Sequence, residues 1–369
     1  MTHKVPRTVT SPKKFIIGSG LLAQLPDFVK DFGDNALIIS DVFIVDRVKK
    51  ESIAALEKAN LKGYAEQFAF ECTDKEIKRL GELAKTQGSN VIVGVGGGKT
   101  LDTAKAVAYY YKLPVILYPT IASTDAPCTA LAVVYKEDHS FDRYLYLPQN
   151  PDAVVADTSI LAAAPARFFA AGIGDALATY FEARACYHSD GLNLVLKRPS
   201  HTGLGLAEMC YDFLCENVEQ AMFAVHNKIS TPALEQVIEA TIYLSGVGAE
   251  SGGLAAAHAV NNGMSVVPDL HQAQHGEKVV FGLLTQLVLE NAPKEEIEDV
   301  IDVIKAAGLP MTLAELGLKS FKEEEWRKVA QLACDKGDTM GNMPFEVTEN
   351  EVYDAMIAAN AMAEYYRKQ

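Results

Sequence analysis

The sequence has few of the features that mark secreted or membrane-spanning proteins. It contains six cysteines in 369 residues and no Cys-x-x-Cys pair, so we expect reduced thiols rather than a disulfide framework. No stretch reaches the roughly 18 apolar residues of a membrane-spanning helix, and the first twenty residues lack the apolar segment of a secretory signal. We therefore expect a cytoplasmic protein with no membrane association.

Positive charge is also scarce. The chain has 34 Lys and Arg against 48 Asp and Glu, which gives a formal net charge of −14. An anionic protein has no electrostatic attraction for nucleic acid or for an anionic lipid surface, so neither is an expected partner. Hydrophobic residues make up 49% of the chain, which is enough for buried cores, and the length predicts more than one domain.

The first part of the chain alternates short apolar runs with helical patterns. Apolar runs occupy residues 35–41, 91–98, 114–120 and 153–158, and helical patterns occupy 51–61 and 74–88. This alternation predicts βαβ units and a parallel sheet. Residues 128–148 contain two β-rich runs separated by a polar turn, which predicts a hairpin.

After residue 162 the strand signals nearly vanish and long helical patterns rich in Ala, Leu and Met follow. Pro165 suits the first turn of the first of these helices. We therefore expect a Rossmann-like α/β domain over residues 1–162 and an all-α domain over 163–369. No flexible linker separates them, so we expect the two to pack together with a cleft between them.

The stretch "GVGGGKTLDTAKAVA" (residues 94–108) resembles a phosphate-binding loop but matches neither common template. Val93 stands where the Walker A motif requires glycine, and Lys99 stands where the GxGxxG fingerprint requires it. The order of strand, glycines and helix still suits an anion, because helix amides point into the loop. The alternative is a tight turn with no ligand. Asp41, at the end of an earlier strand, favours NAD over NADP because its carboxylate would bind ribose hydroxyls and repel a 2′-phosphate.

The helical part contains three candidate metal ligands. Asp175 is predicted near the start of a helix, and His258 and His275 are seventeen residues apart, with His275 opening another helix. A lone histidine on an apolar face is usually a core residue, but one carboxylate and two imidazoles form a ligand set for Zn²⁺ or Fe²⁺. Three protein ligands would leave a position open for a substrate. His271, four residues before His275, is a weaker candidate for a supporting role.

Several long segments between about residues 90 and 295 carry a family resemblance. They include "GVGGGKTLDTAKAVA", "PTIASTDAPCTALAVVY", "APARFFAAGIGDALATYFEARACY" and "HGEKVVFGLLTQLVLENAP". These segments resemble the zinc-dependent glycerol dehydrogenase branch of the iron-containing alcohol dehydrogenase superfamily. The resemblance implies an NAD-binding α/β domain, an all-helical domain, an active site in the cleft between them, and a homo-oligomer, with an octamer as one form to test.

The resemblance also implies roles for individual residues. Asp175, His258 and His275 would be the zinc ligands and, together with Asp125, the catalytic and substrate-binding set. The implied NAD contacts are Asp41, Gly96, Gly97, Gly98, Lys99, Thr100, Leu101, Asp102, Thr120, Ile121, Ala122, Ser123, Thr129, Leu131 and Tyr135.

Three positions depart from patterns in the superfamily. Iron-dependent members carry a fourth ligand, a histidine four residues after the aspartate, where this chain has Thr179. Asn261 stands where relatives commonly have histidine, and residues 271–274 replace a stretch in which aromatic residues are frequent. The last two differences lie close to the expected metal, so they leave the preferred substrate open.

The expected activity is the NAD-dependent oxidation of glycerol to dihydroxyacetone, with zinc acting as a Lewis acid on the substrate hydroxyls. One alternative is another small vicinal diol or an amino-alcohol, such as 1,2-propanediol or 2,3-butanediol. Another is a lyase of the dehydroquinate synthase type or a dehydrogenase of glycerol 1-phosphate. These need cations for a phosphate, and the stretch around the histidines offers only Lys278. A non-catalytic NAD-binding protein is the remaining alternative.

Overall fold

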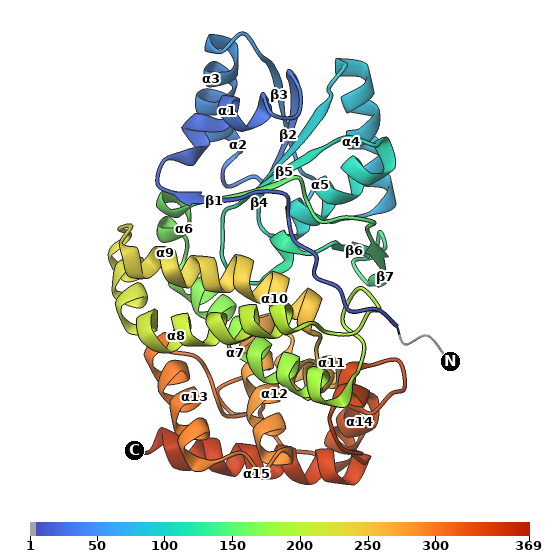
Figure 1. The fold of residues 1–369 in the computed structure, drawn as a ribbon, viewed down its shortest axis with the longest axis vertical. Coiled ribbons are helices and arrows are strands. Elements are labelled where there is room, and N and C mark those ends of the chain that lie inside the picture. The colour runs from blue at the N-terminus through green and yellow to red at the C-terminus, as the bar shows by residue number, and fades with distance from the viewer. Residues whose placement is uncertain (1–4) are drawn as a thin grey trace.

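A parallel sheet forms the upper half of the molecule in the computed structural model, which describes residues 5–369 (Figure 1). Its six strands are ordered β1-β8-β5-β4-β2-β3, and every neighbouring pair is parallel. The strands are β1 (Phe15–Gly18), β2 (Asn35–Ser40), β3 (Lys62–Gln67), β4 (Val91–Gly96), β5 (Val115–Pro119) and β8 (Ala153–Asp157). The four inner strands are buried at every residue, as expected of a parallel sheet covered on both faces.

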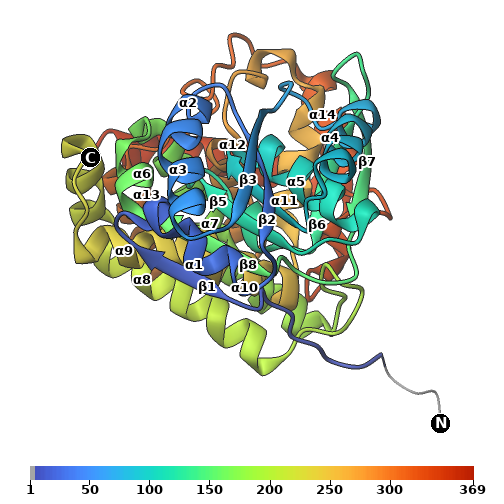
Figure 2. The ribbon, with the colours of Figure 1, turned by 90° about the horizontal axis from the view of Figure 1, so that it is seen from above.

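Helices cover both faces of this sheet (Figure 2). Alternate residues of β2 point to opposite sides: Leu37 and Ile39 belong to one buried cluster and Ile38 to another. The first cluster includes residues of α4 (Asp74–Gln87) and α5 (Gly98–Tyr111), and the second includes residues of α1 (Leu25–Val29) and α3 (Ile53–Lys58). Two short helical segments, α2 (Val45–Arg47) and a π-helical turn (Val48–Ser52), lead into α3.

The remaining strands, β6 (Leu131–Tyr135) and β7 (Phe141–Tyr146), form a separate antiparallel hairpin. The sequence prediction of this hairpin is confirmed, as are the predictions of β2, β4, β5 and β8. The edge strands β1 and β3 were not predicted. Between Asp157 and residue 369, the structure contains no further named strand.

The lower half of the molecule is helical (Figure 1). The helices are α6 (Thr158–Ala163), α7 (Ala166–Ser189), α8 (His201–Asn227), α9 (Pro232–Ile238), α10 (Ser245–Gly252), α11 (Ala256–Gly263), α12 (His275–Leu289), α13 (Lys294–Ala307), α14 (Glu323–Ala333) and α15 (Glu349–Arg367). A π-helical turn (Glu239–Leu244) joins α9 to α10. Over residues 5–369, none of the helices is both long and apolar enough to cross a bilayer.

Two details differ from the sequence prediction or stay open. Pro165 is the residue before the first helical residue of α7, with extended backbone angles, rather than part of the first turn. Pro fits there because it has no backbone N–H to leave unpaired. The expected division after residue 162 falls inside α6, and the assignment of two domains stays a prediction.

Candidate active site

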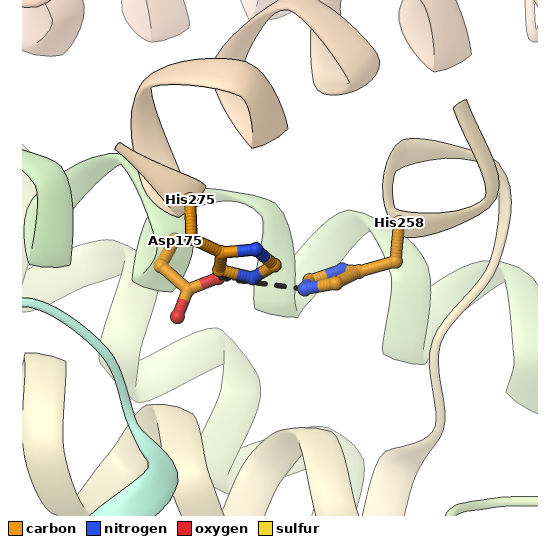
Figure 3. Close-up of side chains that lie close together, drawn as sticks. All are labelled: Asp175, His258 and His275. Carbon is orange, nitrogen blue, oxygen red and sulfur yellow. Dashed lines mark ion pairs between the residues drawn. The ribbon is translucent and has the colours of Figure 1, made fainter. Parts of the chain in front are cut away.

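Three side chains from separate helices meet at one point (Figure 3). Asp175 lies in α7, His258 in α11, and His275 is the first residue of α12. Asp175 Oδ1 lies 3.4 Å from His258 Nε2 and 3.2 Å from His275 Nε2. One donor atom from each residue lies within 4.8 Å of the other two. The three residues that the sequence singled out are thus brought together, although Asp175 lies in the third turn of α7 rather than near its start.

Glycines explain how α7 and α12 approach closely enough for this contact. Gly276 follows His275, and a Cβ atom at Gly276 would lie only 1.7 Å from the carbonyl oxygen of Ala171. Gly174 precedes Asp175, and a Cβ atom there would lie 2.6 Å from the carbonyl oxygen of Gly276. The two helices therefore pack backbone against backbone beside the two side chains. Larger residues at these positions would separate Asp175 from His275.

The charges around Asp175, His258 and His275 favour a positive charge between these three side chains. Burial alone would raise the pKa of Asp175, but the two neighbouring imidazoles hold that pKa well below the ordinary value of an aspartate. Burial lowers the pKa of His258, but the carboxylates of Glu182 and Asp175 raise it well above its ordinary value. A site with this preference and this donor set fits a divalent cation such as Zn²⁺ or Fe²⁺.

Glu182 supports His258 and was not found by sequence reasoning. Its fully buried carboxylate accepts a hydrogen bond from His258 Nδ1 at 2.5 Å and another from the His258 backbone N–H at 2.9 Å. With Nδ1–H donating to Glu182, the ring is oriented so that Nε2 points toward Asp175, and Nε2 is the nitrogen that would bind a metal. The available sequence signal was an acidic residue seven positions after Asp175, two turns along the same face of an apolar helix.

Asn261 contacts the other histidine. Its amide Nδ2 lies 3.4 Å from His275 Nδ1, and its Oδ1 is buried without a hydrogen-bond partner among residues 5–369. A half-turn of the amide would exchange these atoms and give the Nδ1–H of His275 an acceptor. His271 is exposed, and its ring nitrogen lies 3.2 Å from the carbonyl oxygen of Ser265, so it does not join the cluster.

Asp125 approaches from the sheet-bearing half of the molecule, just before a 3₁₀ turn (Ala126–Cys128). Its Oδ2 accepts a hydrogen bond of 3.0 Å from Ser245, and Ser245 Oγ lies 2.9 Å from Thr179 Oγ1. Burial raises the pKa of Asp125 to about 7, and the Asp175 carboxylate contributes to the same rise. Thr179 has its hydroxyl engaged by Ser245.

The glycine loop has open space at the start of α5, and its binding of an anion stays a prediction. Gly97 precedes the first residue of α5, and no side chain caps that end of the helix. A Cβ atom at Gly98 would have no neighbouring atom within 4 Å. Because β2 and β4 are adjacent strands, Asp41 lies beside the loop, and its Oδ2 accepts a hydrogen bond of 3.3 Å from the Gly97 N–H. The open space and the free helix end favour a bound anion over the alternative of an empty turn.

Two charged residues near the loop have partners within the protein. Lys99 Nζ lies 2.7 Å from Glu71 and 4.9 Å from the centre of the Tyr135 ring. The Asp102 carboxylate accepts a hydrogen bond from the backbone of Val133 at 3.0 Å and lies 2.9 Å from Lys105 Nζ. Both side chains therefore contact the β6–β7 hairpin, Lys99 through Tyr135 and Asp102 through Val133. Contacts of either residue with a cofactor stay a prediction.

Some of the other expected cofactor residues contact the glycine loop, and others line the cavity that the two histidines also line. The backbone N–H of Thr120 donates to the carbonyl of Gly96 at 3.0 Å. Thr129 and Leu131 line a cavity of about 960 Å³ that also includes His258 and His275. Thr100, Leu101, Ile121, Ala122 and Ser123 flank the loop, and their contacts with a cofactor stay a prediction.

Comparison with known proteins agrees with this geometry. A family model described as iron-containing alcohol dehydrogenase matches residues 12–158. The chain is 49% identical to a glycerol dehydrogenase of Pseudomonas putida and 48% identical to one of Escherichia coli O6:H1, each match covering 98% of this chain and 99% of the relative.

Solved structures show the same relationship. The structure of a probable glycerol dehydrogenase from Sinorhizobium meliloti matches with a TM-score of 0.89 and 40% identity, covering 97% of this chain and 99% of the other. Glycerol dehydrogenase from Schizosaccharomyces pombe matches with a TM-score of 0.93 and 32% identity, covering 100% of this chain and 93% of the other. The chain therefore belongs to the glycerol dehydrogenase family of the iron-containing alcohol dehydrogenases.

Proposed function

We propose that this protein is an NAD-dependent oxidoreductase that converts glycerol to dihydroxyacetone, with zinc held by Asp175, His258 and His275. The observation on which the proposal chiefly depends is the convergence of these three side chains, two of which, His258 and His275, line a cavity together with Thr129 and Leu131. Family membership supports the reaction class. The donor set accommodates iron as well as zinc, so the choice of zinc is the part that metal analysis must decide.

Each part of the site would have a distinct task. When bound, the zinc supplies Lewis acidity toward a substrate hydroxyl and the NAD accepts a hydride from the carbon that bears it. Glu182 keeps the Nε2 lone pair of His258 directed at the metal. Asp125 accepts a hydrogen bond from a substrate hydroxyl. The hydroxyl proton of the oxidised carbon leaves to solvent as the carbonyl forms.

The cofactor would lie across the glycine loop. The amides at the start of α5 would bind the pyrophosphate, and Asp41 would bind the ribose hydroxyls while repelling a 2′-phosphate. A Cβ atom at Gly98 would project into the space that the cofactor needs.

An uncharged polyol fits the cavity better than a phosphorylated substrate does. Besides the two histidines, Lys197 is the one basic side chain among the described residues that line it, and Glu250 and Asp338 line it as well. A phosphate group would require several cations to offset its desolvation. The cavity therefore disfavours the glycerol 1-phosphate and dehydroquinate synthase alternatives.

The direct test is NADH formation from glycerol by the purified protein before and after treatment with a chelator. We expect activity that is lost on chelation and restored by zinc, with NAD strongly preferred to NADP. Ferrous iron, 1,2-propanediol and 2,3-butanediol belong in the same assay. Restoration by iron alone would overturn the choice of zinc, and inactivity toward glycerol would overturn the proposed substrate.

We propose a cytoplasmic homo-oligomer on the strength of the family resemblance. Light scattering on the eluting protein would distinguish an octamer from smaller assemblies.

A further inference from the structure

Two buried hydroxyl groups form a connection between Asp125 and α7, the helix in which Asp175 lies. Thr179 lies one turn after Asp175 on α7, and its Oγ1 is 2.9 Å from Ser245 Oγ. Ser245 is the first residue of α10, and its Oγ is 3.0 Å from Asp125 Oδ2. Thr179 is 2% exposed and Ser245 is fully buried, so water does not compete for either hydrogen bond.

The direction of these hydrogen bonds follows from the chemistry of the groups. An ionised carboxylate can only accept, so the single hydroxyl proton of Ser245 is donated to Asp125. The oxygen of Ser245 is then an acceptor, and the Thr179 hydroxyl must be the donor to it. When Asp125 is ionised, each hydroxyl has one defined orientation, and the pair forms a directed chain that ends at Asp125 Oδ2.

The start of α10 also packs against the backbone of Asp125. A Cβ atom at Gly246, the residue after Ser245, would lie 2.8 Å from the carbonyl oxygen of Asp125. The start of α10 thus touches Asp125 through both its backbone and a side chain. This double contact fixes the carboxylate relative to the helices that contain Asp175, His258 and His275.

The second carboxylate oxygen of Asp125 is left free. Among residues 5–369, Ser245 is the one side chain that hydrogen-bonds to Asp125, and it does so at Oδ2. Because Thr179 lies one turn after Asp175 on α7, the contacts from Thr179 to Ser245 and from Ser245 to Asp125 place the Asp125 carboxylate near the helix that contributes Asp175 to the candidate metal site. Oδ1 is therefore available to a substrate hydroxyl.

We propose that Ser245, itself oriented by Thr179, is a positioning residue that fixes Asp125 so that Oδ1 accepts a hydrogen bond from a second substrate hydroxyl. Ser245 thereby contributes to the preference for vicinal diols over simple secondary alcohols. The inference depends on the proposed function, because it assigns a source of substrate selectivity to the same site.

The test compares kcat/KM for 1,2-propanediol with kcat/KM for 2-propanol, which lacks the second hydroxyl. We expect Ser245→Ala to lower the ratio of these values about tenfold, the effect of one lost hydrogen bond to a charged group. The loss should appear mainly in KM for the diol. Thr179→Val should give a smaller decrease, and Thr179→Ser, which keeps the hydroxyl, should restore the ratio.

A double-mutant cycle with Asp125→Asn separates positioning from general disturbance of the helix. If Ser245 acts through Asp125, Ser245→Ala has no further effect on the ratio once Asp125→Asn is present. The matched control is Thr241→Val, one turn earlier, because Thr241 is also fully buried but donates to the carbonyl of Ile238. This control should leave the ratio at the wild-type value. Zinc content and NADH binding should be unchanged in all variants.

An unchanged ratio in Ser245→Ala would overturn the inference, as would effects of Ser245→Ala and Asp125→Asn that simply add. Either result leaves the proposed function intact if the wild-type protein oxidises glycerol. Inactivity of the wild-type protein toward every diol would overturn the proposed function itself, and the wild-type assay alone decides that question.

Discussion

Glu182 holds His258 at two points, the ring Nδ1 at 2.5 Å and the backbone N–H at 2.9 Å. The same carboxylate accepts a third hydrogen bond from the backbone of Ala255 at 2.8 Å. One fully buried side chain of α7 therefore fixes the start of α11, the tautomer of His258 and the orientation of its ring. The orientation of His258 at the candidate metal site therefore depends on Glu182.

Glu182→Gln should weaken metal binding by about 10- to 100-fold, the usual effect of losing the charged partner of a ligating histidine. The amide is neutral, so it no longer favours positive charge on the ring or on the metal. Competition with a chromophoric zinc chelator measures the affinity. Glu208→Gln, at an exposed position of α8, is the control and should have no effect. Equal affinity of Glu182→Gln and wild type would contradict the role of Glu182.

Gly276→Ala should damage both stability and metal binding. The new methyl group would meet the carbonyl oxygen of Ala171 at 1.7 Å, so α7 and α12 must move apart and carry Asp175 and His275 with them. We expect a loss of about 1–3 kcal/mol in the free energy of unfolding, typical of overpacking, and a weaker metal site.

Denaturant unfolding and the chelator competition measure the two effects of Gly276→Ala. Gly205→Ala is the control, because Gly205 lies on an exposed part of α8 with no atom within 4 Å of a new Cβ. That change should be neutral or should stabilise the protein by up to about 1 kcal/mol. Equal behaviour of the two alanine variants would show that the close helix contact is unimportant.

His258→Ala should abolish NADH formation from glycerol while leaving NADH binding unchanged. The change removes one of three ligands but lies away from the glycine loop, so only the metal-dependent step is affected. Metal analysis, activity and NADH fluorescence give the three readouts. His201→Ala, an exposed histidine near Tyr187, should match wild type. Substantial glycerol oxidation by His258→Ala would exclude the proposed ligand set.

Gly98→Ala should weaken NADH binding by about tenfold or more, equivalent to at least ~1.4 kcal/mol, with no loss of stability. A Cβ atom at this position meets nothing in the protein, so a bound cofactor is the one group that it would strike. Fluorescence titration gives the dissociation constant, and thermal unfolding checks the fold. Unchanged NADH affinity would place the pyrophosphate elsewhere.

The sequence predicted those features that a local pattern or the chemistry of a single residue type indicates. The buried strands were predicted because they are rich in apolar residues, whereas β3 at a sheet edge has no apolar run and β1 has only four residues. Asp175, His258 and His275 were grouped because of their chemistry, and the structure brings them together, while their role as metal ligands stays a prediction. Glu182 was missed because its role depends on which face of α7 meets α11, and no local pattern shows that.

The same limitation applies to the loop. The sequence placed Lys99 and Asp102 in a phosphate-binding motif, but their partners Glu71, Lys105 and Val133 depend on how the hairpin folds back over α5. A motif identifies where a backbone can bind an anion. It does not show which neighbouring side chains remain free to help.

The ionisation of Asp125 gives a prediction about pH. Burial and the nearby Asp175 raise the pKa of Asp125 to about 7 in the metal-free protein, compared with about 3.9 in an unfolded chain. Between these values the folded state holds a proton that the unfolded state has lost. The contribution of Asp125 to the free energy of unfolding should therefore decrease as pH rises through this window. In Asp125→Asn, which cannot ionise, this decrease should be absent.

Activity should change in the opposite direction, because the ionised carboxylate accepts a stronger, charge-assisted hydrogen bond from the substrate than the neutral acid does. We expect kcat/KM for glycerol to rise tenfold per pH unit on the acid side and then to level off. A bound divalent cation offsets the charge of Asp175, so the midpoint in the metal-loaded enzyme should lie at or below 7. Asp125→Asn should be less active and should lack this acid limb. An acid limb in Asp125→Asn identical to that of the wild type would assign the ionisation to another group and would leave Asp125 with the stability effect alone.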